Sequence, residues 1–328
     1  MYIKRHYTLY NTLIWSYKPF LFGTLYAGAI VSLDYFFEFH ISFPWQPISV
    51  MGIAVAFYLG FKNNSSYDRT WEARKIWGSI VNNSRSYGAA VMAFVQGEDA
   101  DEIKRELIFR HIAWMTALRH QLRLSRPWEH TEERLNNRYN PNVCEDYNNK
   151  LHVELSHFIN EEEVQMVIPE ANTATQILKI QSERMQELRD KNYFEDFRHM
   201  ELHHLVVSFY EDQGKSERIK NFPFPRQYAS TALWLTVVFS LFVPFGMLDV
   251  LDDSNLATAI VIPFIAGLLI WIFFLMEKIG DYSENPFEGT YNDVPITSIA
   301  RAIEIDLKQM LGEEKVPGPI EDENGFLM

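Results

Sequence analysis

Residues Leu256–Met276 read LATAIVIPFIAGLLIWIFFLM, an apolar run that contains no charged side chain. A helix needs roughly 20 predominantly apolar residues to cross the hydrocarbon core of a bilayer, and this run has that length. Three further stretches share its character: Phe20–Phe37, Trp45–Phe61 and Ala229–Leu251. The first of these contains Asp34, which makes it the weakest of the four by hydropathy. The sequence therefore predicts four transmembrane helices.

The charges beside these stretches predict their orientation. The short connections Glu38–Pro44 and Asp252–Asn255 hold neither Lys nor Arg, so the four stretches form two hairpins. Basic residues gather at the opposite ends, which is typical of the cytoplasmic side: Lys4, Arg5, Lys18, Lys62, Arg69, Arg74, Lys75, Lys215, Arg218, Lys220, Arg226 and Lys278. We therefore expect both termini and the central segment to be cytoplasmic. Buried helices of a large soluble protein are the alternative, but they do not explain this asymmetry.

The polar parts of the chain predict a helical body. Amphipathic stretches predict helices over Lys62–Ser86, Asp101–Leu124, Val143–Asn160, Thr173–Arg189, Phe194–Gly214 and Ile296–Leu311. Strand alternation is scarce, so the predicted fold is an all-α membrane protein with four transmembrane helices and a cytosolic helical bundle. The predicted order is residues 1–61 with the first two spans, 62–228 as the cytosolic domain, 229–276 with the last two spans, and 277–328 as a cytosolic helix and tail.

Composition excludes several classes of protein. The net charge of −13 disfavours nucleic acid as a partner, because such proteins usually carry a basic stripe. The only cysteine, Cys144, excludes an internal disulfide and a CxxC metal site. No pairing of a nucleophile with a base and no glycine-rich phosphate loop stands out. We therefore expect neither a cofactor nor enzymatic activity.

The second predicted span carries an apolar stripe. Ile53, Phe57 and Phe61 are spaced at i, i+4 and i+8, so they share one face over about 12 Å of helix. If several copies surrounded an axis, this face would form stacked apolar rings, which can gate ions by dewetting. Ordinary packing against lipid or another helix explains the same spacing.

The stretch after this span leads to a family resemblance. It reads KNNSSYDRTWEARKIWG over residues 62–78 and is followed by GKSERIKNFPFP at 214–225 and ENPFEG at 284–289. Together with the two pairs of spans, these segments resemble the bestrophin family, and its bacterial members in particular, over most of the chain from Tyr7 to Leu311. The most specific pattern consists of Tyr67, Asp68, Arg69, Trp71, Glu72, Arg74, Trp77 and Gly78.

The resemblance implies a homopentameric ion channel in the bacterial inner membrane, with lipid and its own copies as partners. The family's hydrophobic pore neck falls on Ile53, Phe57 and Phe61, and its cytosolic constriction falls near Phe197. Animal members conduct anions, so chloride is the expected monovalent ion. A sodium-selective channel of the same fold is the alternative, because apolar rings do not select the sign of the charge.

Two further features of the sequence bear on metal binding, the loop after Asn-Pro-Phe and a pair of histidines. Animal members hold calcium in an acidic loop after Asn-Pro-Phe, but only Glu288 and Asp293 are acidic here, and calcium takes six to eight oxygen ligands. We therefore do not expect calcium activation. His199 and His203 form an HxxxH pair, a weak metal signal that leaves a metal-dependent membrane enzyme as an alternative. A membrane-anchored scaffold for a soluble partner is the other.

Overall fold

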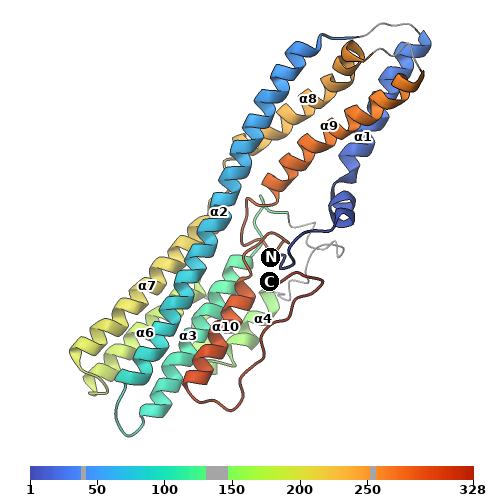
Figure 1. Cartoon of the computed structure of the whole chain (residues 1–328). Coiled ribbons are helices and arrows are strands. Elements are labelled where there is room, and N and C mark those ends of the chain that lie inside the picture. The colour runs from blue at the N-terminus through green and yellow to red at the C-terminus, as the bar shows by residue number, and fades with distance from the viewer. Residues whose placement is uncertain (38–41, 131–146, 252–255) are drawn as a thin grey trace. The chain divides into compact units, whose positions relative to one another are not determined.

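The computed structural model describes residues 1–37, 42–130, 147–251 and 256–328 (Figure 1). Cys144, the connection Asp252–Asn255 and most of Glu38–Pro44 lie outside the described residues. Within the described residues the regular elements are ten helices: α1 (Leu9–Phe37), α2 (Trp45–Phe94), α3 (Ala100–Arg123), α4 (Tyr147–Leu155), α5 (Glu161–Val167), α6 (Thr173–Asp190), α7 (Asp196–Asn221), α8 (Arg226–Val250), α9 (Leu256–Asp281) and α10 (Ile296–Met310). The predicted all-α class is confirmed.

The chain divides into two compact units that are not contiguous in sequence. One unit, here called the span unit, comprises residues 4–68 and 223–284. The other, here called the body unit, comprises residues 1–3, 69–222 and 285–328. Helix α2 belongs to both, since its residues up to 68 lie in the span unit and those from 69 onward lie in the body unit.

Three helices of the span unit, α1, α8 and α9, are long and apolar enough to cross a membrane by length and composition. Helix α2 is not among them, because its apolar stretch ends at Phe61, where Lys62 and two asparagines follow. The four helices of this unit share one apolar core, which includes Ala27, Val31, Ile48, Val55, Leu59, Phe239, Val243, Ile262, Ala266 and Ile270.

Helices α1 and α9 approach each other closely at small residues. A Cβ added to Gly267 would contact Thr24 Oγ1 and would lie 3.0 Å from the backbone nitrogen of Thr24 and 3.1 Å from the carbonyl oxygen of Phe20. A Cβ on Gly23 would lie 3.2 Å from the Cα of Gly267. Small residues of this kind allow helices in a membrane to pack backbone against backbone.

Gly267→Ala is therefore expected to destabilise the span unit by about 1–3 kcal/mol, because the added methyl group forces the two backbones apart. The matched control is Gly28→Ala in α1, where the new Cβ would lie 3.9 Å from Pro263, an ordinary contact distance. Alanine also favours a helix over glycine by about 1 kcal/mol. Thermal unfolding of the purified variants should show a lower Tm for Gly267→Ala only. An equal Tm for both would contradict the close approach.

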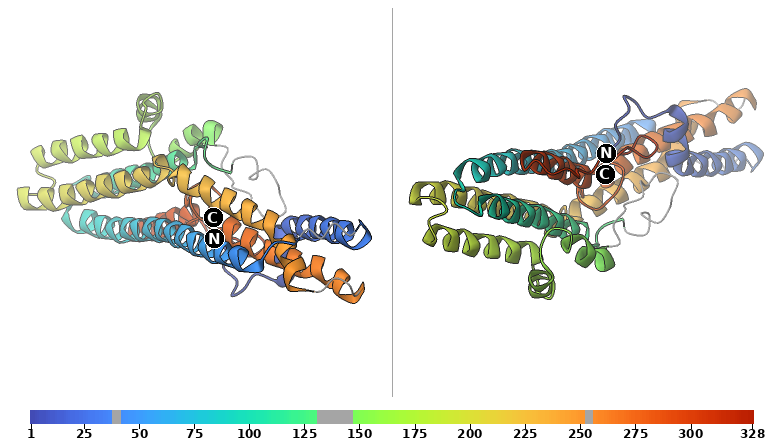
Figure 2. Two further views of the ribbon diagram at one scale, coloured as in Figure 1. Left: turned by 90° about the horizontal axis from the view of Figure 1, so that it is seen from above. Right: turned by 90° about the horizontal axis from the view of Figure 1, so that it is seen from below.

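The body unit has a second core, in which α3 packs against α6, α7 and α10 (Figure 2). Trp77 and Trp114 are fully buried there. The indole nitrogen of Trp114 donates a hydrogen bond of 2.9 Å to Gln213, and the amide of Gln181 donates one of 2.8 Å to the carbonyl oxygen of Leu107. These bonds fix α6 and α7 against α3, because a buried polar group without a partner is costly.

Candidate functional site

The apolar stripe predicted on α2 lies on the surface of the chain. The exposed fractions of Ile53, Phe57 and Phe61 are 70 %, 68 % and 57 %. The rings of Phe57 and Phe61 meet edge to face, with 4.6 Å between their centroids. Three large apolar side chains in one exposed row are unusual for a soluble surface and indicate contact with lipid or with other copies of the chain.

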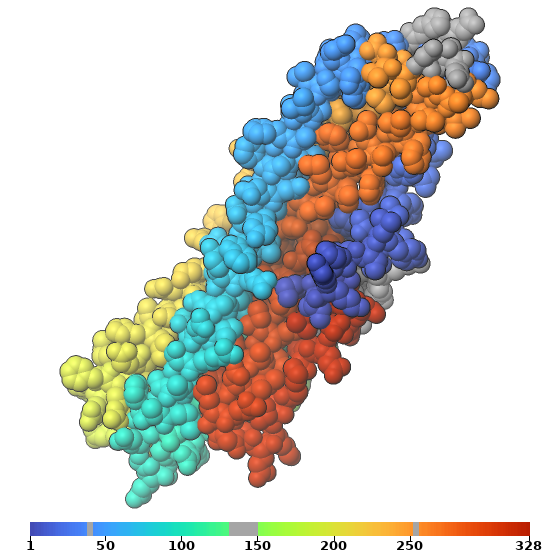
Figure 3. All heavy atoms as spheres, in the orientation of Figure 1, coloured from blue at the N-terminus to red at the C-terminus, as the bar shows by residue number. Residues whose placement is uncertain are grey.

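The exposed face of α2 continues beyond the stripe with a polar character. Side chains of α2 are visible along the helix in Figure 3. The exposed positions follow one another at intervals of three and four residues: Asn64, Asp68, Trp71, Lys75, Gly78 and Asn82. This spacing keeps them on one face of the helix. The face that begins with Ile53 thus changes after Phe61 from wholly apolar to mostly polar, with Trp71 as its exposed aromatic residue.

A buried ion pair lies directly after the apolar stripe. The Nζ atom of Lys62 lies 2.8 Å from Glu277 Oε1 and 3.6 Å from Asp281 Oδ1, both on α9, and the Lys62 side chain is only 1 % exposed. Beside it, the side-chain oxygen of Asn63 occupies the space that a Cβ on Gly280 would need. The cluster therefore fixes the end of the apolar part of α2 to the end of α9.

Two residues of the family pattern hold α2 to the last turn of α7. Arg69 NH2 donates hydrogen bonds to the carbonyl oxygens of Ile219, at 3.1 Å, and Phe222, at 2.8 Å. These carbonyls lie at a helix C-terminus, where backbone acceptors have no partner within the helix. Glu72 forms an ion pair with Arg218. Both interactions lie within the body unit.

Of the other residues of the family pattern, one lies in the core of the body unit and the rest lie on the surface. Trp77 is fully buried in the core of the body unit. Tyr67 and Trp71 are 59 % and 47 % exposed, and Asp68, Arg74 and Gly78 are also exposed. A Cβ on Gly78 would meet no atom within 4 Å, so the chain itself does not require glycine there. Exposed aromatic side chains such as Tyr67 and Trp71 are enriched at interfaces between protein chains.

Phe197, the predicted cytosolic constriction, lies in the first turn of α7 and is 85 % exposed. His199 and His203 follow it on the same helix, with nearly parallel rings whose centroids are 6.1 Å apart. Within the residues that the structure describes, no group of three or more His, Cys, Asp and Glu side chains is placed to hold a metal ion. The histidine pair thus gains no third ligand there.

The two acidic residues of the loop after Asn285-Pro-Phe are each paired with a basic side chain, an arginine and a histidine. Arg123 of α3 forms a buried ion pair with Asp293, and its NH2 group donates a bond of 3.3 Å to the carbonyl oxygen of Val294. His130 Nδ1 lies 3.2 Å from Glu288 Oε1. Sequence reasoning noted the loss of carboxylates here but missed both partners.

The Arg123–Asp293 pair gives a testable pH dependence. Burial raises the pKa of Asp293 to about 6, against the opposing charge of Arg123, and neighbouring Glu288 raises it further. The folded protein thus holds this proton more firmly than the unfolded chain. Protonated Asp293 therefore contributes to the free energy of unfolding. This contribution is complete below the ordinary pKa of 3.8 and is lost as the pH rises through about 6.

Asp293→Asn, which cannot ionise, is therefore expected to remove part of the pH dependence of stability. Between about pH 5 and about pH 7, wild type should lose on the order of 1–2 kcal/mol relative to the variant. Thermal unfolding of both proteins across this range measures the difference. A difference in Tm that does not change with pH would contradict the raised pKa.

Comparison with known proteins places the chain in a family. The model of the family described as Bacterial/Fungal Bestrophin protein matches residues 12–309. The "Voltage-dependent anion channel-forming protein YneE" of Escherichia coli K12 is 28 % identical over 92 % of this chain and 88 % of that protein. The "Voltage-dependent anion channel-forming protein mll4386" of Mesorhizobium japonicum is 25 % identical over 90 % of this chain and 85 % of that protein.

The solved structures show the same fold. A crystal structure of a bacterial bestrophin homologue from Klebsiella pneumoniae matches with a TM-score of 0.75 and 22 % identity, over 90 % of this chain and 98 % of that one. A substituted form of the same homologue has a TM-score of 0.75 over 94 % of this chain and 100 % of that one. The match to the family model extends over most of the sequence. The chain therefore belongs to the bacterial and fungal bestrophin family.

Proposed function

We propose that this chain forms an ion channel that passes small monovalent anions through a pore lined by α2. The observation that carries the proposal is the exposed apolar row of Ile53, Phe57 and Phe61 on that helix. Facing its own copies across a water-filled axis, the row would form three stacked rings that control ion passage by dewetting. The relatives from E. coli and M. japonicum are named as channel-forming proteins and not as enzymes, which supports this function.

The proposed assembly is a homopentamer in the bacterial inner membrane. Helices α1, α8 and α9 and the Trp45–Phe61 part of α2 would cross the bilayer as four spans, with both termini and the helical body in the cytoplasm. The basic residues at the cytoplasmic ends of the spans support this orientation. Phe197 would form the second constriction, since it is highly exposed at the first turn of α7.

We further propose that this channel does not need calcium to open. In the loop of Glu288 and Asp293, Arg123 and His130 already pair with the two carboxylates. A calcium ion would have to displace these groups, and the loop offers few other carboxylates to complete its six to eight ligands.

The test is the reversal potential of the purified protein in a planar bilayer under a gradient of sodium chloride. A reversal potential near the chloride equilibrium value is expected. A value near that of sodium would replace the anion channel by the cation-selective alternative. Absence of any current, together with a soluble protein that co-purifies, would favour the membrane-anchored scaffold.

A further inference from the structure

The first turns of α1 extend beyond the apolar run of that helix. Helix α1 has 29 residues and is thus about 44 Å long, whereas the hydrocarbon core of a bilayer is about 30 Å thick. The apolar run begins at Phe20, directly after Pro19, and residues 9–18 add about 15 Å of helix before it. In the membrane orientation proposed above, these turns lie at the level of the lipid headgroups on the cytoplasmic side.

One side of these turns is fixed against α9. The indole nitrogen of Trp271 donates a hydrogen bond of 2.9 Å to Ser16 Oγ. The Nζ atom of Lys278 donates one of 3.0 Å to the carbonyl oxygen of Trp15. The rings of Trp15 and Tyr282 meet edge to face, with 5.7 Å between their centroids. These contacts determine which side of α1 faces away from the span unit.

The opposite side of the same turns is exposed and consists of leucine and tyrosine. Four large side chains there are between 44 % and 73 % exposed: Leu9, Tyr10, Leu13 and Tyr17. Intervals of three and four residues keep such positions on one side of a helix. Tyrosine is enriched at the boundary between membrane and water, where its ring contacts apolar chains and its hydroxyl group contacts headgroups. The composition of this side therefore fits contact with lipid.

Three basic residues without a carboxylate partner border the exposed side. Lys4, Arg5 and Lys18 are exposed, and none of them forms an ion pair with any residue that the structure describes. Residues 1–33 contain no Asp or Glu, although the whole chain has 43 acidic and 30 basic residues. These three residues and the exposed side of residues 9–17 are here called the basic α1 surface. It is a positively charged region of a chain whose net charge is −13.

Acidic residues at the end of α9, which packs beside these turns, have partners of their own. Glu277 and Asp281 lie on either side of the buried ammonium group of Lys62, at 2.8 Å and 3.6 Å. Glu284, which follows α9, pairs with Arg226 at 2.5 Å. These carboxylates are therefore already engaged within the span unit and do not neutralise the basic α1 surface.

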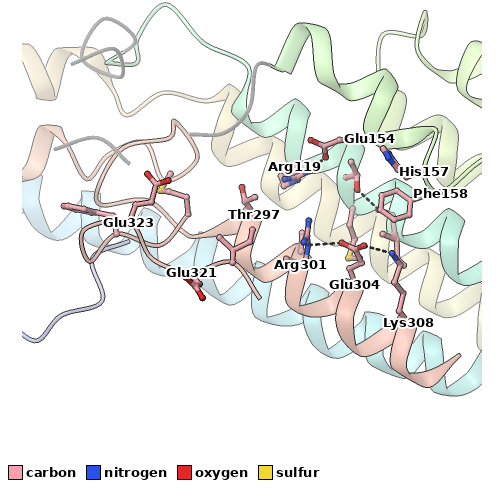
Figure 4. A pocket seen from close by; sticks show the side chains of 17 residues that line it. Arg119, Glu154, His157, Phe158, Thr297, Arg301, Glu304, Lys308, Glu321 and Glu323 are labelled. Carbon is pink, nitrogen blue, oxygen red and sulfur yellow. Dashed lines mark hydrogen bonds and ion pairs between the residues drawn. The ribbon is translucent and has the colours of Figure 1, made fainter. Parts of the chain in front are cut away.

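The cations around the largest cavity of the body unit show the contrast, because carboxylates balance them. This cavity of about 500 Å³ is lined by four glutamates and by three Lys and Arg residues (Figure 4). Glu304 accepts from Arg301 Nε at 3.0 Å and from Lys308 Nζ at 2.8 Å. Arg119 pairs with Glu154 in the same lining. An excess of positive charge is thus a property of the basic α1 surface and not of this cavity.

We infer that the basic α1 surface binds the headgroups of anionic phospholipids. Its Lys and Arg side chains hold the phosphate through charge-assisted hydrogen bonds, and its leucine and tyrosine side chains lie against the acyl chains. An anionic lipid supplies both the negative charge and the apolar part that complement this surface, whereas a free anion supplies only the charge. The inference rests on the proposed location of α1 in the membrane but not on ion conduction.

The test is a competition between two phospholipids for the purified full chain. The protein in detergent is incubated with equal amounts of phosphatidylglycerol, which is anionic, and phosphatidylcholine, which is zwitterionic, both with the same acyl chains. The phospholipid that the protein retains through gel filtration is then extracted and quantified. At least about fivefold more phosphatidylglycerol than phosphatidylcholine is expected, because each Lys or Arg near an anionic membrane surface contributes about that factor to binding.

A further arm distinguishes the lipid from its headgroup alone. A large excess of sn-glycerol 3-phosphate, which carries the phosphate without acyl chains, should not displace the retained phosphatidylglycerol. Displacement by this compound would show that the surface binds a free phosphate and would overturn the assignment to lipid.

The combined variant Lys4→Gln, Arg5→Gln and Lys18→Gln should lower the ratio of the two retained lipids to about one. The charge-preserving variant Lys4→Arg, Arg5→Lys and Lys18→Arg should keep the ratio of wild type. Because all three side chains are exposed, thermal unfolding of both variants should match that of wild type, which verifies that they fold.

The matched control removes three exposed lysines of the body unit by combining Lys75→Gln, Lys191→Gln and Lys315→Gln. It changes the net charge by the same amount and should leave the ratio unchanged. Equal retention of the two lipids by wild type, or a preference that the first variant keeps, would overturn the inference. Retention of neither lipid would overturn it together with the membrane location of α1. Absence of ion current would bear on the proposed channel alone, since lipid retention is measured without conduction.

Discussion

Phe57→Ala is expected to raise the single-channel conductance severalfold. Phe57 is the middle member of the exposed row on α2, and its ring also contacts that of Phe61. In the proposed pore, alanine would widen the middle ring and make it easier to wet, which lowers the barrier to ion passage. Each 1.4 kcal/mol removed from a barrier is worth about a factor of ten in rate. Single-channel recording in a planar bilayer measures the change.

Phe22→Ala provides a matched control for this experiment. Phe22 lies on α1, is 59 % exposed and contacts an aromatic residue four positions later, Tyr26, with 6.0 Å between ring centroids. It thus resembles Phe57 in exposure and local packing but does not lie on the α2 stripe. Its removal should leave the conductance unchanged. Equal conductance of wild type, Phe57→Ala and Phe22→Ala would contradict the assignment of the neck.

Most helices could be predicted from the sequence, because their apolar periodicity agrees with their packing. The prediction over Thr173–Arg189 matches α6 to within one residue, and that over Asp101–Leu124 matches α3 equally well. Helix α7 was predicted to end at Gly214 but continues to Asn221. Buried contacts of the following turns outweigh the low helix propensity of glycine.

Helix α7 ends just before a proline. Phe222 has extended backbone angles, and Pro223 follows it. Proline disfavours the helical conformation in the residue before it, so the helix cannot continue through Phe222. Helix α1 was predicted from Phe20 but begins at Leu9. Its first turns mix polar and aromatic residues and precede Pro19, so hydropathy alone gives no sign of them.

The sequence could predict only those parts of the candidate site that lie on one helix. The row of Ile53, Phe57 and Phe61 follows from helical spacing, and its exposure agrees with the hypothesis of a pore neck, which stays a prediction. The buried ion pairs could not be predicted, because the partners are far apart in sequence. Lys62 and Glu277 are separated by 215 residues, and Arg123 and Asp293 by 170. Only the tertiary fold brings such groups together.

Lys62→Met is expected to be the most destabilising of the substitutions discussed. The substitution keeps the length of the side chain but leaves Glu277 in a largely buried position with Asp281 nearby and without the ammonium group that lies between them. Removing one partner of a buried ion pair costs about 3–5 kcal/mol, because the remaining charge is left uncompensated. The expected fall in Tm is on the order of 10 °C, measured by thermal unfolding of the purified protein at a fixed heating rate.

Two further variants test whether the loss of stability comes from the unpaired carboxylate and not simply from removing a lysine. Lys75→Met removes an exposed lysine from the same helix and should change Tm by no more than a few degrees. Lys62→Met combined with Glu277→Gln removes both charges of the closest pair, so it should recover part of the lost stability. If Lys62→Met unfolded at the same temperature as Lys75→Met, the pair would not be holding α2 to α9. If the double variant were less stable than Lys62→Met, the uncompensated carboxylate would not be the cause of the loss.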